Sequence, residues 1–542
     1  MGGNGKRMAA CILGLSLAGC ALSGAEKAAP FQKLRSGFSP EGENRFHTSQ
    51  ALENASLAAT SKSPQDDQNE TPRGEAQRLV HADVSRALQT SFIRTGHDLP
   101  VSASPAEVVE EIVQLPAPLL RVWEPHDDSV ALLQQAESLS MPGDALNNPC
   151  IADSPEGCAR FAMSGFFDAL DQANSGTGTA RITVFGNSLH ASDRIVNIVR
   201  DRMQTHFGNA GQGFLLPDRL ASYGSRRRTG FRTWGFSPFN VVWGAKTKYP
   251  MGAAGSLHLG RNRAKASFKV EGERKMRVYA LAHPRGGSLR VSTETNAETF
   301  SLRSTKAEGR IFEFSLPIGA KTVQLESRGS RAPVYGASLE GAGSGVMLDT
   351  LAIIGADSTR YLRSDATLFR THLQDLKPDL VTLFLGGNEV KRVAWGSAST
   401  KVVRRDLEKL LDRVRDARPE ASCLVIGPLE NVVGSQPTRR KRVRQVTNPW
   451  AGRPETIWVN DIMRDVAAEK GCAYYDLYAA MGAKGAMQRL HRARLLHKDM
   501  IHPKGKGLDI IGELVFGAIM DAYVSSPVAA ASRSSIARTA FR

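Results

Sequence analysis

The sequence lacks the patterns that identify several classes of binding protein. Its 542 residues include six cysteines, and no Cys/His spacing indicates a zinc site. No zinc-finger spacing, basic zipper or alternation of aromatic and basic residues occurs, so nucleic acid is not an expected partner. Acidic residues are outnumbered by basic ones, 54 against 70, which leaves a formal charge of +16. This imbalance favours anionic surroundings such as an envelope polymer or a membrane surface, although an Arg-rich composition alone would also produce it.

The N-terminus has the organisation of an export signal. Two basic residues precede the apolar run MAACILGLSLAGC, which is too short to span a bilayer but fits a signal peptide. The run ends in Leu-Ala-Gly-Cys at 17–20, which resembles the bacterial lipobox. That resemblance implies removal of residues 1–19 and lipidation of Cys20. Because Ala21 follows, it also implies an outer-membrane anchor facing the periplasm. The alternative is an ordinary signal peptide with a chance cysteine.

Four cysteines lie beyond the signal region. Cys150 and Cys158 are close together in a polar loop, and in an exported protein they can form a local disulfide. Cys423 and Cys472 begin apolar runs with the character of strands. We therefore expect Cys423 and Cys472 to be buried apolar residues.

The ends of the chain have the composition of linkers. Residues 20–140 begin rich in Ser, Ala, Glu, Asn and Gln and continue with weakly helical stretches that have no evident core. We expect a largely disordered linker with some helix there, and a disordered tail at 526–542.

Between these ends the pattern is that of a parallel α/β protein. Five short apolar runs have the composition of buried parallel strands. They are RITVF from 181, DTLAII from 349, LVTLFL from 380, CLVIG from 423 and CAYYDL from 472. Amphipathic stretches alternate with them, at 193–206, 359–376, 402–416, 456–470 and 508–522. The alternation predicts an open, mostly parallel sheet covered by helices.

The segment 217–345 interrupts this alternation. It is rich in glycine, and its short alternating runs, such as Ala266, Phe268 and Val270, are separated by turn residues. This pattern predicts an inserted antiparallel β-sandwich. The α/β domain would then consist of two parts, 141–216 and 346–525.

Chemically useful residues follow the predicted parallel strands, and such sites form beyond the carboxyl ends of the strands. Ser188 follows the first strand, Gly355 the second and Asn388 the third, while Asp499 and His502 precede the last helix. Acyl transfer needs a nucleophile, a base, a group that orients the base, and donors for an oxyanion. We assign these roles to Ser188, His502 and Asp499 in that order. The expected donors are the N–H groups of Ser188 and Gly355 and the side-chain amide of Asn388.

Each of these residues also has an ordinary structural interpretation. Taken alone, Ser188 and Asp499 could cap helices, and Asn388 could be a turn residue. We expect His190 to be a pocket-wall or surface residue rather than the base, and Glu389 to be structural. The basic run PTRRKRVRQ at 437–445 is either a solvated loop or a contact for an anionic glycan.

Four blocks carrying Ser188, Gly355, Asn388 and His502 in this order resemble the SGNH, or GDSL-type, hydrolases, and Asp-x-x-His matches their last block. The resemblance covers about 145–215 and 346–524. It implies a three-layer, flavodoxin-like α/β fold with a five-stranded parallel sheet, and a serine esterase without metal or cofactor. The first block is usually Gly-Asp-Ser in this family, but Asn187 precedes the serine here. This departure removes a negative charge beside the nucleophile and leaves the triad untouched.

The insertion after the first block resembles the arrangement in bacterial peptidoglycan O-acetylesterases, in which a carbohydrate-binding-module-like domain interrupts the hydrolase. This resemblance implies an exported esterase that removes O-acetyl or other short acyl groups from an envelope polysaccharide, and peptidoglycan is the first candidate. The alternatives are a lipid esterase or lysophospholipase, an O-acetyltransferase, and a non-catalytic glycan-binding lipoprotein. The acyl group, the polymer and the oligomeric state are left open.

Overall fold

The computed structural model describes residues 127–526, apart from 156, 191–192, 221–228, 243–246 and 436–447. The predicted signal, Cys20, most of the linker, the basic run at 437–445 and nearly all of the tail lie outside the described residues. Within the described part of the chain, no helix is long and apolar enough to cross a membrane.

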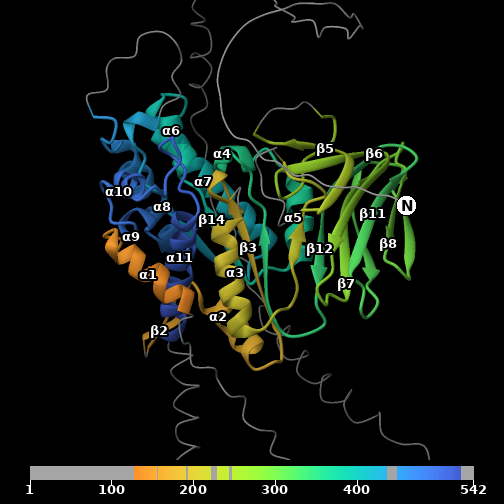
Figure 1. The fold of residues 1–542 in the computed structure, drawn as a ribbon, viewed down its shortest axis with the longest axis horizontal. Helices are drawn as coiled ribbons and strands as arrows, with labels where there is room; N and C mark the ends of the chain where they lie inside the picture. Colours follow the sequence, from red (N-terminus) through yellow and green to blue (C-terminus); the bar gives the residue numbers. More distant parts are fainter. Residues whose placement is uncertain are drawn as a thin grey trace, which may run out of the picture. The chain divides into compact units, whose positions relative to one another are not determined.

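A five-stranded parallel sheet, with strand order β13-β3-β14-β15-β16, forms the centre of the α/β part, as predicted (Figure 1). Its strands are β3 (Thr179–Gly186), β13 (Gly345–Thr350), β14 (Leu380–Phe384), β15 (Ser422–Ile426) and β16 (Ala473–Tyr475). The strand that comes first in the chain is second in the sheet, which is the flavodoxin-like order. The order in which successive strands are added to the sheet therefore reverses between β3 and β14, where a site is expected.

The second strand differs from the expected run DTLAII. β13 ends at Thr350, and the apolar residues that follow form a buried loop instead. Leu351 and Ile353 still donate backbone hydrogen bonds to Val184 and Gly186 of β3. A short apolar run indicates that a segment is buried, but it does not show whether the buried segment is a strand or a loop packed under other elements.

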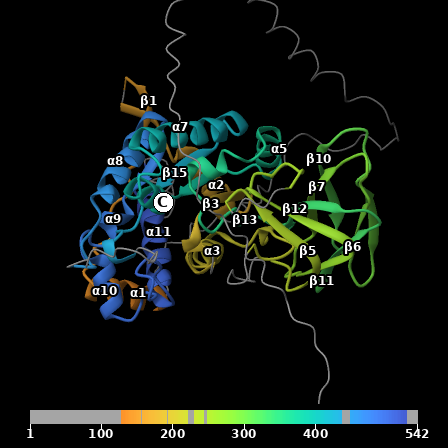
Figure 2. The same ribbon diagram turned by 90° about the horizontal axis from the view of Figure 1, so that it is seen from above.

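Helices cover both faces of the parallel sheet (Figure 2). One face packs against α2 (Ser164–Asn174), α3 (Arg194–Phe207) and α11 (Lys506–Val524). The other packs against α5 (Ala366–Leu376), α7 (Thr400–Ala417) and α8 (Pro454–Glu469). Along β3, Ile182 and Val184 enter the first core and Phe185 the second. This two-sided burial explains why the strands are continuous apolar runs.

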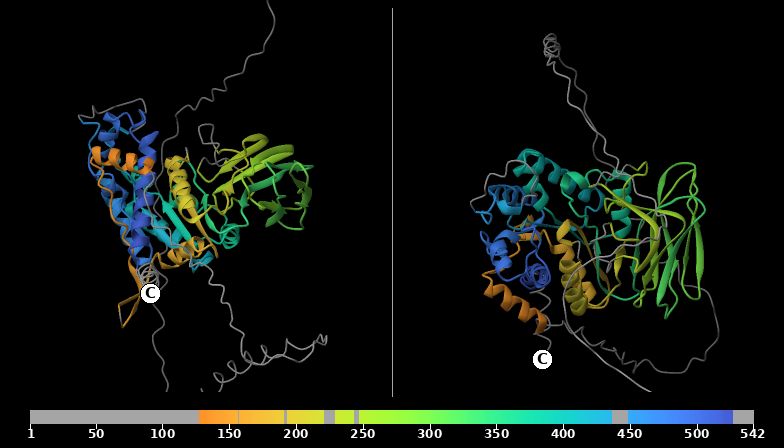
Figure 3. Two further views of the ribbon diagram at one scale, coloured as in Figure 1. Left: turned by 60° about the horizontal axis from the view of Figure 1, so that its bottom comes forward. Right: turned by 45° about the horizontal axis from the view of Figure 1, so that its top comes forward.

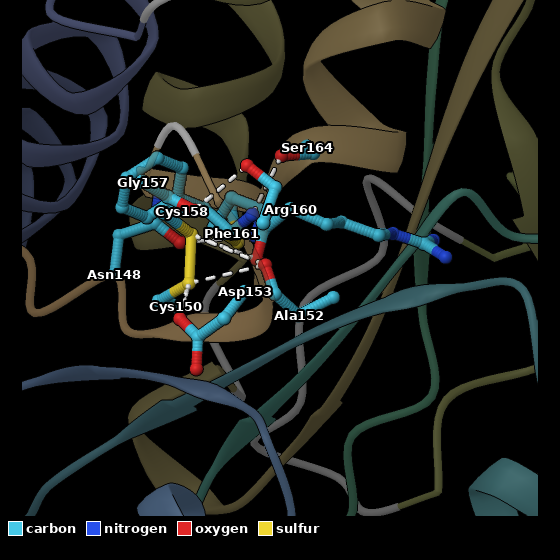
Figure 4. The surroundings of a disulfide bond; sticks show 11 residues. Asn148, Cys150, Ala152, Asp153, Gly157, Cys158, Arg160, Phe161 and Ser164 are labelled. Atoms are coloured by element: carbon cyan, nitrogen blue, oxygen red, sulfur yellow. Dashed lines mark hydrogen bonds between the residues drawn. A yellow bond between two sulfur atoms is a disulfide. The ribbon is translucent and has the colours of Figure 1, made fainter.

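The described chain begins with a helix inside the segment 20–140, for which a linker with some helix was predicted. Helix α1 (Asp127–Ser138) packs against α11, and its Ala136 is buried in the first core. A hairpin of β1 (Cys150–Ser154) and β2 (Gly157–Phe161) follows. A disulfide joins Cys150 to Cys158 within this hairpin (Figure 4).

A second disulfide contradicts the expectation for Cys423 and Cys472, which are bonded to each other. Leu424 of β15 is in register with Ala473 of β16, so the two preceding cysteines lie opposite one another. Their Cα atoms are 4.8 Å apart, within the range that a disulfide spans. Only the pairing of these two strands brings the cysteines together, because they are 49 positions apart in the chain.

Nine antiparallel strands form the predicted β insertion between β3 and β13. They are β4 (Gly213–Leu215), β5 (Arg232–Asn240), β6 (Ser256–Lys269), β7 (Lys275–Ala282), β8 (Ser288–Ser292), β9 (Ala297–Ser301), β10 (Glu308–Ser315), β11 (Thr322–Arg328) and β12 (Ala332–Glu340). β4 already belongs to this sheet, so the insertion begins a few residues before 217.

Hydrogen bonds connect all nine strands into one sheet that folds over its own core (Figure 3). The long strand β6 makes this possible by changing partner: its first part pairs with β12 and its last part with β11. Arg263, with φ 63°, lies between the two parts, where the strand bends. The two layers expected of a sandwich are therefore halves of one continuous sheet.

The inserted sheet and the α/β part share a hydrophobic core. Phe214 and Tyr279 of the insertion belong to the same cluster as Phe185 and Phe369, whose rings stack 5.5 Å apart. The insertion is therefore an integral part of the hydrophobic core.

Candidate active site

The turn after β3 holds Ser188 at the carboxyl edge of the sheet. β3 ends at Gly186, where a Cβ would lie 2.4 Å from the His190 ring, so a side chain does not fit. The short 3₁₀ turn η1 (Ser188–His190) follows. Asn187 is buried and its Oδ1 accepts the Leu189 N–H at 3.0 Å. An aspartate oxygen could accept the same bond, so Asn187 maintains the turn while removing a charge.

Ser188, His502 and Asp499 form a hydrogen-bonded chain. The Ser188 Oγ lies 2.7 Å from His502 Nε2, and His502 Nδ1 lies 2.7 Å from Asp499 Oδ2. The other oxygen of Asp499 accepts the backbone N–H groups of Ile501 and His502, at 2.9 and 3.1 Å. These bonds leave Asp499 Oδ2 facing the imidazole. The arrangement is that of a nucleophile, a base and an orienting acid.

The carboxylate of Asp499 is held in its charged form although its side chain is exposed to solvent. Burial acts to raise the pKa of Asp499, but hydrogen bonds from the His502 ring and from backbone N–H groups outweigh it, and the net pKa is lowered. The side chains of His502 and Asp499 are 30% and 43% exposed. The hydrogen-bonded side chains of Ser188, His502 and Asp499 are therefore open to solvent, and an attacking water can reach them.

The expected oxyanion donors lie on three loops that are bonded to one another. Gly355 has φ +79°, a conformation that favours glycine, in the loop after β13. Asn388 is near the start of α6 (Gly387–Ala394), and its Nδ2 donates to Ala356 O at 2.7 Å. This bond uses one of the two amide hydrogens. Ile353 N–H donates to Gly186 O, which ties the second loop to the turn that carries Ser188. Within the described residues, the N–H groups of Ser188 and Gly355 have no backbone or side-chain acceptor.

The expectation for His190 is wrong. Its side chain is neither in a pocket wall nor on the surface but buried, 2% exposed, with its ring edge-on to Phe384 at 4.8 Å. Burial lowers the pKa of His190 to about 3, so the imidazole is neutral. His190 packs under the turn against Phe384, and the imidazole that is hydrogen-bonded to Ser188 is that of His502.

Glu389 lies inside the molecule behind the donors. It is 3% exposed and accepts backbone hydrogen bonds from Gly386 and Ser358. Burial, with the neighbouring charge of Asp357, raises the pKa of Glu389 to about 7.

The structure also brings to the site two residues that the sequence did not single out. Val242 follows β5 of the insertion, and its Cγ1 would lie 3.1 Å from a Cβ at Gly355. Lys391 lies on α6 one turn after Asn388, half-buried near the triad acid: burial lowers the pKa of Lys391, Asp499 opposes the shift and Arg453 adds to it. The helical spacing from Asn388 was a usable signal for Lys391. Nothing in the sequence pattern pointed to Val242, which comes from the inserted sheet.

The described residues contain no group of three or more His, Cys, Asp or Glu side chains placed to hold a metal ion. The chemistry that the arrangement can perform with its own groups is acyl transfer through a serine.

Comparisons with known proteins agree with this geometry. Residues 319–510 match the model of the GDSL-like Lipase/Acylhydrolase family. The match contains Gly355, Asn388, Asp499 and His502; it starts at residue 319, within the insertion, and so does not include Ser188. Among curated proteins, none matches the chain.

The fold is similar to that of a solved structure described as a peptidoglycan O-acetylesterase in action. The TM-score is 0.56 at 19% identity, and the similarity covers 67% of this chain and 97% of that one. An acetyl xylan esterase structure scores 0.23 at 17% identity, covering 33% of this chain and 81% of its own, which is too low to support an argument. The family match, the shared fold and the hydrogen-bonded Ser188, His502 and Asp499 lead to one conclusion: residues 319–510 of this chain are similar to the GDSL-like Lipase/Acylhydrolase family, and its α/β part has the fold and the hydrogen-bonded groups of a serine esterase.

Proposed function

We propose that the protein is an exported esterase that removes O-acetyl or other short acyl groups from an acylated envelope polysaccharide, with peptidoglycan as the first candidate. The observation that carries the proposal is the hydrogen-bonded chain from Ser188 through His502 to Asp499. The choice of polymer is supported by the similarity in fold to a peptidoglycan O-acetylesterase over 97% of that structure.

In the proposed mechanism, Ser188 Oγ attacks the ester carbonyl carbon while His502 Nε2 accepts the serine proton. Asp499 holds the imidazole by its Nδ1–H. The N–H groups of Ser188 and Gly355 and the free amide hydrogen of Asn388 stabilise the tetrahedral oxyanion. Its collapse breaks the bond to the sugar oxygen, which takes the proton from His502. Water activated by His502 then attacks the acyl-enzyme, releases the carboxylic acid and regenerates Ser188.

The test is release of acetate by the purified protein from O-acetylated peptidoglycan, with Ser188→Ala as control. We expect release from the wild type alone. Acetylated xylan and long-chain acyl esters serve as comparison substrates. Faster turnover of long-chain esters would favour the lipid esterase, and acetyl transfer to an added glycan without free acetate would favour the transferase.

For the insertion, we propose contact with the polymer through a row of exposed and half-buried residues on its sheet. Trp234 on β5 is 67% exposed. It lies opposite Lys265, which is followed across the sheet by Glu326 and Arg290. Directly opposed residues share one face of a sheet, so the Trp234 ring lies there beside Lys265, and Arg290 follows in the same row after the acidic Glu326. Aromatic rings pack on sugars, and Arg pairs with carboxylates.

The corresponding variant is Trp234→Ala, with Trp458→Ala on α8, itself 48% exposed, as the matched control. Trp234→Ala should reduce kcat/KM on the polymer and leave p-nitrophenyl acetate hydrolysis unchanged. Equal rates on the polymer for both variants would contradict a role of this face.

We further propose a lipid anchor at Cys20, on the outer membrane facing the periplasm, from the lipobox-like sequence at 17–20. Cys20→Ser should leave an unprocessed, unlipidated precursor. Cleavage at another position, with mature wild-type protein soluble without detergent, would contradict the anchor.

A further inference from the structure

A buried carboxylate joins the two loops that carry Gly355 and Asn388. Glu389 Oε2 accepts the backbone N–H of Gly386 at 2.9 Å. Glu389 Oε1 accepts the backbone N–H of Ser358 at 2.9 Å and the Ser358 hydroxyl at 3.1 Å. Gly386 lies two residues before Asn388, and Ser358 lies three residues after Gly355. Each carboxylate oxygen therefore holds one of the two loops.

The identity of this residue matters because of what each oxygen must do. An ionised carboxylate presents acceptors on both oxygens, whereas a side-chain amide presents an acceptor on one side and donors on the other. Both oxygens of Glu389 face backbone N–H groups, so only the ionised carboxylate, the form that predominates above its pKa of about 7, satisfies the two loops at once. At 3% exposure, the side chain has little water to replace a lost partner.

Other bonds connect the same loops. Asn388 Nδ2 donates to Ala356 O at 2.7 Å. Asp357, fully buried, accepts from Arg392 of α6 at 3.0 Å, and Arg392 also donates to Thr359 at 2.8 Å. These contacts keep α6 against the segment after Gly355. Glu389 differs from them because it binds the backbone on both sides, one residue from Asn388.

We propose that Glu389 is a positioning residue that sets the Asn388 amide at its working distance from the Gly355 N–H, so that both donate to the same oxyanion. The inference rests on the proposed acyl-transfer mechanism and adds a residue to it. Glu389 does not touch the substrate. It acts through Asn388, and its effect should appear in the transition state rather than in substrate binding.

The first test is Glu389→Gln, assayed on p-nitrophenyl acetate. We expect kcat to fall by about 10- to 100-fold with KM within about twofold, because a displaced oxyanion donor weakens stabilisation of the transition state. The matched control is Ser358→Ala, which removes the 3.1 Å hydroxyl contact but keeps the backbone N–H bond. It should retain kcat within about threefold.

A double-mutant cycle separates positioning from general damage. If Glu389 acts through Asn388, Glu389→Gln should lower kcat by less than about threefold once Asn388→Ala is already present. The full loss repeated in that background would overturn the proposal, as would wild-type kcat in the single variant. Thermal unfolding shows whether each variant is folded.

Glu389→Asp provides the second variant should the glutamine variant not fold. It keeps the charge but is one methylene shorter, so it can hold one loop fully and the other only weakly. An intermediate loss of kcat is expected, and wild-type kcat here would also overturn the proposal. Hydrolysis of p-nitrophenyl acetate by the wild type tests acyl-ester hydrolysis itself. If the proposed function is wrong, the wild type will be inactive. If only this inference is wrong, the wild type will be active and the Glu389 variants will not lose kcat as expected.

Discussion

Asp499→Asn is the substitution for which the structure makes the sharpest prediction. Asp499 Oδ1 accepts two backbone N–H groups, from Ile501 and His502, while Oδ2 accepts from His502 Nδ1. In the variant, the amide oxygen must remain with the two backbone donors, and the amide NH₂ then faces Nδ1. The imidazole must accept at Nδ1 and carry its proton on Nε2, which points it at Ser188 Oγ. In that tautomer His502 cannot take the serine proton.

The expected loss has two parts. The first is loss of the attraction between the Asp499 carboxylate and the imidazolium, whose charges are roughly 4 Å apart. That attraction is worth about 1 kcal/mol in bulk water and about 4 kcal/mol in a partly buried site. Because Asp499 is 43% exposed, a value near 2 kcal/mol is appropriate, or about 30-fold in rate. The second part is the wrong tautomer, which together with lost charge reaches about 10⁴-fold where the aspartate is buried. Exposure here reduces the expected total to about 10²- to 10³-fold in kcat.

The assay is hydrolysis of p-nitrophenyl acetate across substrate concentration, because the loss should fall on kcat and leave KM nearly unchanged. Asp509→Asn is the matched control, since Asp509 pairs with Arg194 on the surface and has no bond to the triad. It should behave as the wild type. A kcat for Asp499→Asn within about threefold of the wild type would refute the assignment of Asp499 as the orienting acid.

Three further predictions concern the same site and its support. Ser188→Ala should abolish ester hydrolysis while thermal unfolding shifts little, because the half-buried hydroxyl packs against no core; persistent turnover would exclude it as nucleophile. Asn388→Ala should lower kcat by about 10²- to 10³-fold, and a change confined to KM would mean that it only binds substrate. Acid should destabilise the fold, because burial lowers the pKa of His190 and His372 to about 3, against 6.5 when unfolded. The unfolded chain then takes up protons first as pH falls below 6.5, and each imidazole contributes about 2 kcal/mol of lost stability at pH 5. Urea unfolding at pH 7.5 and pH 5 measures this, and equal stability would mean that the two imidazoles protonate in the native state.

The fold class and the triad residues could be predicted from the sequence because both leave local patterns. Parallel strands buried on two faces must be continuous apolar runs, and the helices between them must be amphipathic. The residues after those strands meet at one edge, whatever the intervening length, so Ser188 and Asn388 could be associated across the insertion. The pairing of Asp499 with His502 could be predicted because the two residues are three positions apart on one loop.

Other features depended on which segments meet in space. The bond between Cys423 and Cys472 follows from the register of β15 and β16, which no local pattern specifies. Burial of His190 depends on Phe384 from another strand.

The residues around the oxyanion donors show the same division. The sequence indicated Gly355 and Asn388 as candidate donors, because a glycine and an amide after buried strands have recognisable chemistry. The backbone bonds of Glu389 to Gly386 and Ser358 exist only once α6 has packed against the segment after β13. Chemistry carried by a residue type can be read locally, whereas the position of that residue is set by contacts between segments distant in the chain.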